Sequence, residues 1–308
     1  MTTPLLIAGH GTSDEAGAEQ FRQFVKRVDG ILDAPVAGGF IELSNPPIAE
    51  AVDALLAAGA PLAGGAPLSA GALLAGGAPL SAGARRIAAV PLMLVTAGHA
   101  KGDIPASLAR ERQRHEGLSF VYGRPLGPHP TVLALLRERL AEFSLQPETM
   151  VLLVGRGSSD PDANAEVARA ARLLAETTPV AGVEYGFVSL AAPGVPAGLE
   201  RCRLLGAKRI VVLPYFLFTG VLPRRVASQA ASWSLSSGIP VDTAEVIGDC
   251  DGLASLVVER YEEALRGQAR ANCDTCLYRI ALPGHEHRVG APQMPHDHPH
   301  DHAHPRSH

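Results

Sequence analysis

The fold is decided by Leu5-Leu6-Ile7-Ala8-Gly9-His10-Gly11-Thr12-Ser13-Asp14, near the beginning of the chain. Its short apolar run predicts a buried strand of a parallel sheet. The small, oxygen-bearing side chains that follow predict the start of a helix. This pattern places His10 at the carboxyl end of a strand, where open α/β sheets bind their ligands.

The same pattern occurs again in the second half of the chain. Residues 151–160 read Val151-Leu152-Leu153-Val154-Gly155-Arg156-Gly157-Ser158-Ser159-Asp160, so that Arg156 takes the place of His10. The spacing agrees as well. From His10 to His99 is 65 residues once a 24-residue insertion is set aside, and from Arg156 to Val221 is also 65. The sequence therefore predicts a duplicated unit.

Three further matches extend the duplication. Tyr185–Leu190 matches Gly38–Leu43, Leu205–Ile210 matches the turn before the third strand, and Val211–Gly220 matches that strand up to Gly98. We predict an α/β fold with two duplicated domains, in which each domain is a parallel sheet covered by helices on both faces.

The predicted domains are an amino-terminal α/β half over 1–145, a carboxyl-terminal α/β half over 146–267 and a disordered tail over 268–308. Residues 61–84 form an insertion in the first half, because a Gly-, Ala- and Pro-rich segment repeats there with a period of 12 residues. We interpret it as a mobile surface loop; a contact with a partner or a membrane is the alternative.

Composition narrows the function. The 308 residues are 46% hydrophobic, enough for two modest cores, and no run of about 18 apolar residues predicts a membrane span. The net charge of −4, without basic runs, argues against nucleic-acid binding. The start of the chain lacks a basic signal segment, and four cysteines do not make a disulfide scaffold, so we expect a cytoplasmic protein.

Three candidate metal ligands follow strands of the first half. His10, Glu42 and His99 each come after a predicted strand, at the same edge of one sheet. Two imidazoles and a carboxylate suit a divalent transition metal such as Co²⁺, Fe²⁺ or Ni²⁺. The alternative is that each histidine only forms a hydrogen bond with nearby backbone. Two histidines in equivalent glycine-flanked positions favour the metal site.

The second half lacks these ligands, since Arg156 and Ser189 occupy two of the matching places. We predict that it binds carboxylates of a substrate, through arginines and the backbone N–H groups of a helix start. The residues assigned to substrate binding are Arg156, Ser158, Ser159, Arg224 and Arg225 of this half, together with Lys101 of the first half. For Arg224 and Arg225, ordinary surface charge is the alternative.

Two motifs near the end of the chain concern metals. Cys273-x-x-Cys276 is half of an iron–sulfur or metal site, which two chains could complete, or it is an unliganded pair. Eight of the twelve histidines lie from His285 onward, several alternating with Asp or Pro, which suits weak metal binding or storage. A metal-storage or delivery protein is therefore one alternative function, and a phosphoryl-transfer enzyme that uses His10 is another.

Taken together, the motifs resemble one family. The chain resembles the long form of the sirohydrochlorin cobaltochelatases, in the class II tetrapyrrole chelatase family, over nearly all residues outside 61–84. The resemblance rests on Ala8-Gly9-His10-Gly11, Phe40-Ile41-Glu42-Leu43, Ala97-Gly98-His99-Ala100-Lys101-Gly102-Asp103-Ile104-Pro105, Asn272-Cys273-Asp274-Thr275-Cys276-Leu277-Tyr278-Arg279 and the His-rich end.

The resemblance implies a lyase that inserts a divalent metal, cobalt first, into sirohydrochlorin on the route to cobalamin. Insertion of iron for sirohaem is the alternative within the family. His10 and His99 would bind the metal in a cleft, and Glu42 would assist. Some long members carry a 4Fe-4S cluster on a Met-x-Cys-x-x-Cys motif, from which this chain departs by having Ala271 in place of the methionine. The predicted assembly is a monomer or a homodimer, without nucleic-acid or membrane partners.

Overall fold

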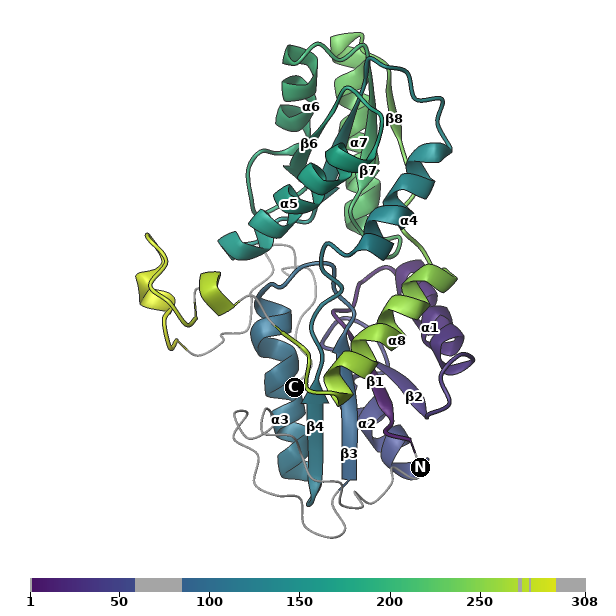
Figure 1. Cartoon of the computed structure of the whole chain (residues 1–308), viewed down its shortest axis with the longest axis vertical. Helices are drawn as coiled ribbons and strands as arrows, with labels where there is room; N and C mark the ends of the chain where they lie inside the picture. Colours follow the sequence, from purple (N-terminus) through teal and green to yellow (C-terminus); the bar gives the residue numbers. More distant parts are fainter. Residues whose placement is uncertain (1, 59–84, 271–272, 277, 292–308) are drawn as a thin grey trace. The chain divides into compact units, whose positions relative to one another are not determined.

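The computed structural model describes residues 2–58, 85–270, 273–276 and 278–291 (Figure 1). The chain divides into two compact units, Met1–Ala271 and Asn272–His308. Within its described part, the second unit contains two short 3₁₀ helices, η3 (Cys273–Thr275) and η4 (Glu286–Arg288). The predictions for the insertion 61–84 and for the histidines from His296 onward lie outside the described residues.

The first unit contains two parallel sheets of the same topology (Figure 1). In the first sheet the order is β2-β1-β3-β4, with β1 (Leu5–Gly9), β2 (Val36–Phe40), β3 (Arg85–Pro91) and β4 (Leu118–Tyr122). In the second the order is β6-β5-β7-β8, with β5 (Thr149–Gly155), β6 (Gly182–Phe187), β7 (Arg209–Pro214) and β8 (Val241–Thr243). The matching order confirms the predicted α/β duplication.

Helices cover both faces of each sheet, as predicted. On the first sheet, α2 (Ile48–Ala57) and α3 (Ile104–Arg114) share a buried core with Leu6 and Ala8 on one face. On its other face lie α1 (Glu15–Asp29) and α8 (Asp251–Leu265). The second sheet carries α6 (Val195–Leu204) and α7 (Val221–Ser237) on one face, and α5 (Pro161–Thr177) and α4 (Pro130–Ala141) on the other.

Two of these helices are exchanged between the halves (Figure 1). Helix α4 follows the first sheet in sequence but packs against α5 and β7 of the second half. Helix α8 follows the second sheet but packs against α1, β3 and β4 of the first half, and also against α4. Helix α4, which lies within the predicted amino-terminal half 1–145, therefore packs with the second half, because its apolar face joins a core that extends through both halves.

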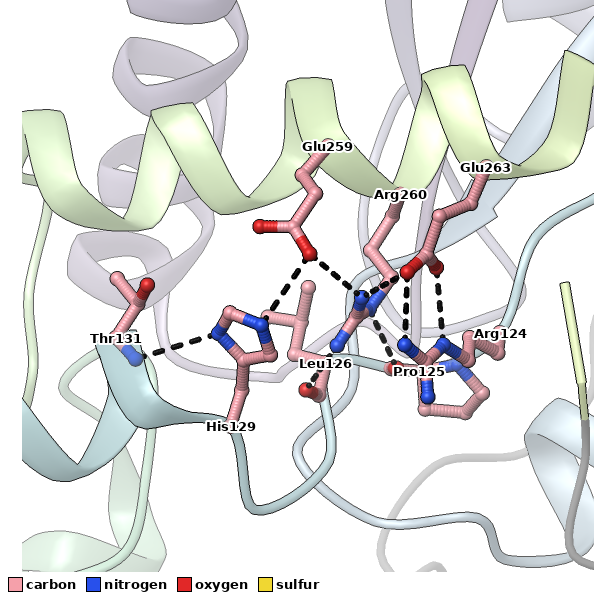
Figure 2. Close-up of polar contacts among 8 residues, drawn as sticks. All are labelled: Arg124, Pro125, Leu126, His129, Thr131, Glu259, Arg260 and Glu263. Atoms are coloured by element: carbon pink, nitrogen blue, oxygen red, sulfur yellow. Dashed lines mark hydrogen bonds and ion pairs between the residues drawn. The ribbon is translucent and has the colours of Figure 1, made fainter. Parts of the chain in front are cut away.

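Buried polar contacts join α8 to the loop that leads into α4 (Figure 2). The Arg260 side chain on α8 is 2% exposed and donates to the carbonyls of Pro125 at 3.2 Å and Leu126 at 3.1 Å, in the loop before α4. It also pairs with Glu263 at 2.9 Å, and Glu263 accepts two hydrogen bonds from Arg124 at 2.7 and 2.9 Å. The guanidinium is thus fully engaged, as a buried charge requires.

Equivalent aspartates begin the helix after the first strand of each half. Asp14 caps α1 by accepting a hydrogen bond from the Gly17 N–H at 3.2 Å, and Asp160 caps α5 through the Asp162 N–H at 3.1 Å. Each cap satisfies a backbone donor that the helix itself leaves open. None of the helices in the described residues has both the length and the apolar character needed to cross a lipid bilayer.

Candidate metal centre

The three predicted ligands converge at the carboxyl edge of the first sheet. His10 follows β1, Glu42 follows β2, and His99 begins a π-helical turn, η2 (His99–Asp103), that comes after β3. One ligand atom from each residue lies within 4.8 Å of the others. Nε2 of His10 is 3.7 Å from Oε1 of Glu42, and the two imidazole centroids are 4.1 Å apart at an interplanar angle of 76°.

This geometry suits a metal ion. Metal bonds to imidazole nitrogen and carboxylate oxygen are about 2.0–2.2 Å long, so that two ligands of one ion lie roughly 3–4 Å apart. The 3.7 Å between Nε2 of His10 and Oε1 of Glu42 lies within this range, and the ligand atoms of all three residues lie within 4.8 Å of one another. The set is the one group of this kind that the described part of the chain contains.

Asp103 orients His99. Nδ1 of His99 lies 2.6 Å from Oδ2 of Asp103, and these side chains are 9% and 18% exposed. A carboxylate acceptor places the proton of the neutral ring on Nδ1, which makes Nε2 the nitrogen suited to ligate a metal. The sequence analysis did not assign Asp103 to the site. The sequence feature that could have identified Asp103 is its spacing of four residues from His99, because residues four apart on a helix lie side by side.

His10 is oriented by backbone. Its Nδ1 lies 3.1 Å from the carbonyl oxygen of Gly11, which can only accept, so Nδ1 is the donor. The opposite nitrogen, Nε2, is the one that faces Glu42. In both histidines the hydrogen bond at Nδ1 makes Nε2 the nitrogen suited to ligate a metal.

Arg156 lies close to this site from the second half. Burial lowers the pKa of its guanidinium, and the carboxylate charge of Glu42 acts in the opposite direction. Because such an effect requires proximity, Arg156 lies near Glu42. The duplication thus puts an arginine near the candidate metal ligands, at the position where the first half has His10.

Lys101 connects the π-helical turn to the second half instead of pointing to solvent. Its Nζ donates to Asp160 at 2.7 Å and to Asp162 at 3.1 Å, and the Lys101 side chain is 10% exposed. Burial acts to lower the pKa of Lys101, but the two aspartates outweigh it, and the pKa is raised. The substrate-binding role predicted for Lys101 does not fit this buried ion pair.

A second link joins the same two segments. The backbone N–H and the hydroxyl of Thr96 donate to Glu166 at 2.7 and 2.9 Å. Burial raises the pKa of Glu166, while these two hydrogen bonds oppose the rise. The loop that leads to His99 is therefore fixed to α5 at two points.

The other residues assigned to substrate binding have local roles or lie at the surface. Arg224 forms an ion pair with Asp14. The hydrogen bond between them is the main cause of the lowered pKa of the Asp14 carboxyl. The Ser158 hydroxyl accepts a hydrogen bond from the Asp160 N–H at 3.0 Å. Ser159 is exposed and Arg225 is half-buried.

Comparison with known protein families agrees with the geometry of the site. A sequence model of the CbiX family matches residues 4–64, 78–143 and 150–264. The chain belongs to the CbiX family. The unmatched residues between the first two segments fall inside the predicted insertion 61–84.

Two relatives in this CbiX group carry different metal names. The chain is 35% identical over 289 residues to the sirohydrochlorin cobaltochelatase of Priestia megaterium, which covers 91% of this chain and 86% of that protein. It is 31% identical over 264 residues to the sirohydrochlorin ferrochelatase of the same organism, covering 85% and 90%.

Solved structures agree on the fold. The sirohydrochlorin chelatase SirB from Bacillus subtilis subspecies spizizenii, in complex with cobalt, has a TM-score of 0.67 and 26% identity over 86% of this chain and 95% of its own. SirB from Bacillus subtilis with Fe³⁺ gives a TM-score of 0.69 and 26% identity, over 87% and 99%.

The cysteines of this CbiX-family chain differ in their surroundings. Cys202 lies in the core of the second half, where burial raises its pKa to about 12, so it is an unreactive thiol at neutral pH. Cys276 is half-buried and carries no disulfide. The side chain of Cys273 lies outside the described residues, so the 4Fe-4S site on Cys273 and Cys276 stays a prediction.

Proposed function

We propose that this chain inserts a divalent metal, Co²⁺ first, into sirohydrochlorin, as a step of cobalamin synthesis. The observation that carries the proposal is the convergence of His10, Glu42 and His99 within 4.8 Å at the carboxyl edge of the first sheet. The sequence identity with the cobaltochelatase, over most of both chains, supports cobalt as the metal.

The ligand set explains how a metal can be bound and then released. Three side-chain ligands leave part of the coordination sphere open, and the nitrogens of a tetrapyrrole can enter there before the protein ligands leave. Asp103 and the Gly11 carbonyl fix the two imidazoles through Nδ1, so both rings are oriented before the metal arrives. The metal ion is a substrate of this reaction.

Insertion also requires proton acceptors. Two pyrrole N–H protons must leave as the metal enters, which keeps the charge of the complex balanced. An imidazole that has released the metal can accept one proton at Nε2. Glu42, 3.7 Å from Nε2 of His10, can accept the other or carry a proton onward to solvent.

The second half supplies substrate recognition in this proposal. Sirohydrochlorin carries many carboxylates, and a guanidinium can hold a carboxylate through two hydrogen bonds. Arg156 is the residue we assign first, because it lies near Glu42. Ser158, Ser159 and Arg225 stay in the proposed binding surface, and Arg224 would have to leave Asp14 to join it.

Iron is the second candidate metal, for sirohaem. The 31% identity with a ferrochelatase and the likeness to SirB with Fe³⁺ favour it specifically. Imidazole and carboxylate ligands accept either ion, so the ligand types do not choose between them.

The experiment is metal insertion into purified sirohydrochlorin without oxygen, with Co²⁺, Fe²⁺ and Ni²⁺ tested separately. We expect the absorption spectrum of the free macrocycle to disappear catalytically, and fastest with Co²⁺. Faster turnover with Fe²⁺ would assign the sirohaem role. Metal binding without spectral change would indicate storage or delivery, and an acid-labile phosphohistidine at His10 would indicate phosphoryl transfer. A cytoplasmic location and a monomeric or homodimeric state remain predictions.

A further inference from the structure

Each half of the molecule contains one tight turn centred on a leucine. Leu43 has a φ of +63°, and the N–H of Ser44 donates to the carbonyl of Glu42 at 2.8 Å across it. Leu190 has a φ of +60°, and the N–H of Ala191 donates to the carbonyl of Ser189 at 2.7 Å. Within the described residues, these two leucines are the only residues other than glycine with a positive φ.

Leucine is an unfavourable residue at such a position. A hydrogen bond between residues two apart, around a central residue with positive φ, defines a rare and strained γ-turn. Glycine or asparagine adopts this backbone conformation at lower cost. Backbone strain of this kind clusters at active sites and ligand contacts, so both turns are candidates for a functional role.

Each turn is held against the loop that carries the neighbouring site residue. A Cβ on Gly11 would lie 1.7 Å from the Glu42 carbonyl oxygen, and one on Gly157 would lie 1.9 Å from that of Ser189. Both glycines have positive φ, so the loops fit together only because these positions lack side chains.

Hydrogen bonds add to this contact. The Glu42 N–H donates to the His10 carbonyl at 3.2 Å, and the Ser189 N–H donates to the Arg156 carbonyl at 3.0 Å. These contacts fix the backbone of Glu42 and of Ser189, and therefore also the position of the leucine that follows each of them.

The two halves keep the leucine although they differ in the ligands beside it. His10 and Glu42 of the first half correspond to Arg156 and Ser189 in the second, so metal binding cannot explain the shared turn. Leu43 is 49% exposed and Leu190 is 53% exposed, so neither is needed to fill a core. A shared partner that touches both halves explains both leucines.

We propose that Leu43 and Leu190 are apolar contacts for the tetrapyrrole ring, one from each half. The proposal rests on the proposed function and names part of its substrate-binding surface. The two sheet edges adjoin, because Lys101, two residues after His99, donates to Asp160 and Asp162, which follow Arg156. Leucine side chains at these edges would contact the apolar ring system and hold it at the metal, while arginine binds the carboxylates at its periphery.

The test measures ring binding apart from metal handling. Leu43→Asn, Leu190→Asn and the double variant are compared with Leu235→Asn, a change of an 89% exposed leucine on α7. Affinity for metal-free sirohydrochlorin is measured by fluorescence quenching, and KM for Co²⁺ and the thermal midpoint Tm are measured in parallel. Asparagine is enriched at positive φ among the residues other than glycine, and Tm reports whether the fold is retained in each variant.

We expect each single variant to weaken sirohydrochlorin binding about tenfold, and the double variant more, with KM for Co²⁺ and Tm unchanged. The conservative variant Leu43→Met should retain most of the affinity for sirohydrochlorin. Unchanged sirohydrochlorin affinity in the double variant would overturn the inference, and a lowered Tm with unchanged affinity would assign the leucines a purely structural role. If the unmodified protein neither binds nor metallates sirohydrochlorin, the proposed function itself fails.

Discussion

His99 and Asp103 lie four residues apart on η2, and Nδ1 of His99 donates to Oδ2 of Asp103 across 2.6 Å. The imidazole is thereby held through Nδ1. Because a carboxylate behind a ligating histidine fixes its tautomer and increases its basicity, we expect Asp103 to position His99 for metal binding.

We expect Asp103→Ala to weaken Co²⁺ binding about 10- to 100-fold and to leave sirohydrochlorin binding unchanged. Isothermal titration with Co²⁺ and fluorescence titration with the macrocycle separate the two effects. Asp33→Ala, at an exposed loop position, is the control. Equal loss of both affinities would point to a general structural defect instead.

His10→Ala and His99→Ala should each abolish metal insertion while the circular dichroism spectrum stays native. Glu42→Gln keeps the shape of the side chain but removes its basicity, and should lower kcat by about 100- to 10,000-fold. His115→Ala, at the end of α3, should retain full activity. Near-normal turnover in either His10 or His99 variant would contradict the site.

Lys101→Met should lower the free energy of unfolding by about 3–5 kcal/mol, because it leaves two buried aspartates without their cation. The triple variant with Asp160→Asn and Asp162→Asn removes those charges and keeps a capping side chain on α5, so it should regain much of the loss. Urea unfolding measures all three proteins. Equal stability of Lys101→Met and the unmodified protein would contradict the buried ion pair.

The same ion pair predicts an alkaline limit of stability. The pKa of Lys101 is raised, so above about pH 10.4 the folded state holds a proton that the unfolded state loses. The unfolding free energy contributed by Lys101 is therefore complete below that pH and falls as the pH rises through the folded pKa. Lys101→Met should remove this part of the pH dependence.

His129, which lies between the start of α4 and Glu259 on α8, should make the stability of the folded protein sensitive to acid. Its Nδ1 accepts the Thr131 N–H at 3.2 Å as the cap of α4, and its Nε2 lies 3.3 Å from Glu259 (Figure 2). Burial lowers the pKa of His129, and Arg260 and Arg124 oppose the charged form, while Glu259 favours it. The unfolded state then binds the proton more readily, so stability falls as the pH drops below about 6.5.

His129→Asn keeps a capping side chain without an imidazole, and should flatten the unfolding free energy between about pH 5 and 6.5. His115→Asn serves as the comparison. A pH profile that is identical in the His129 variant and the unmodified protein would exclude His129 as the cause.

Removal of residues 285–308 takes away eight of the twelve histidines. We expect kcat at saturating Co²⁺ to stay close to that of the full chain, and the amount of metal retained after gel filtration to fall. An inactive truncated protein at saturating metal would show that the segment takes part in catalysis.

The strands and the convergence of the three candidate ligands could be predicted because both depend on local order. An apolar run such as 151–155 identifies a buried strand by itself, and residues that follow parallel strands must meet at one sheet edge. His10, Glu42 and His99 therefore could be brought together without knowing any tertiary contact.

The helix exchange and the role of Lys101 could not be predicted in this way. The apolar face of α4 shows that the helix packs on something, but not on which of two similar sheets. Lys101 lies next to the predicted site in sequence, yet its partners Asp160 and Asp162 are about 60 residues away and become its neighbours only in the folded chain.

The exchange of α4 and α8 means that neither half is a self-sufficient folding unit. If the polypeptide were cut between residues 145 and 146, α4 would be separated from the second sheet on which it packs, and α8 from the first sheet. Two separate half-length chains could bury those surfaces only by trading helices with each other. The duplicated chain is in this sense a domain-swapped dimer whose two subunits have been joined end to end.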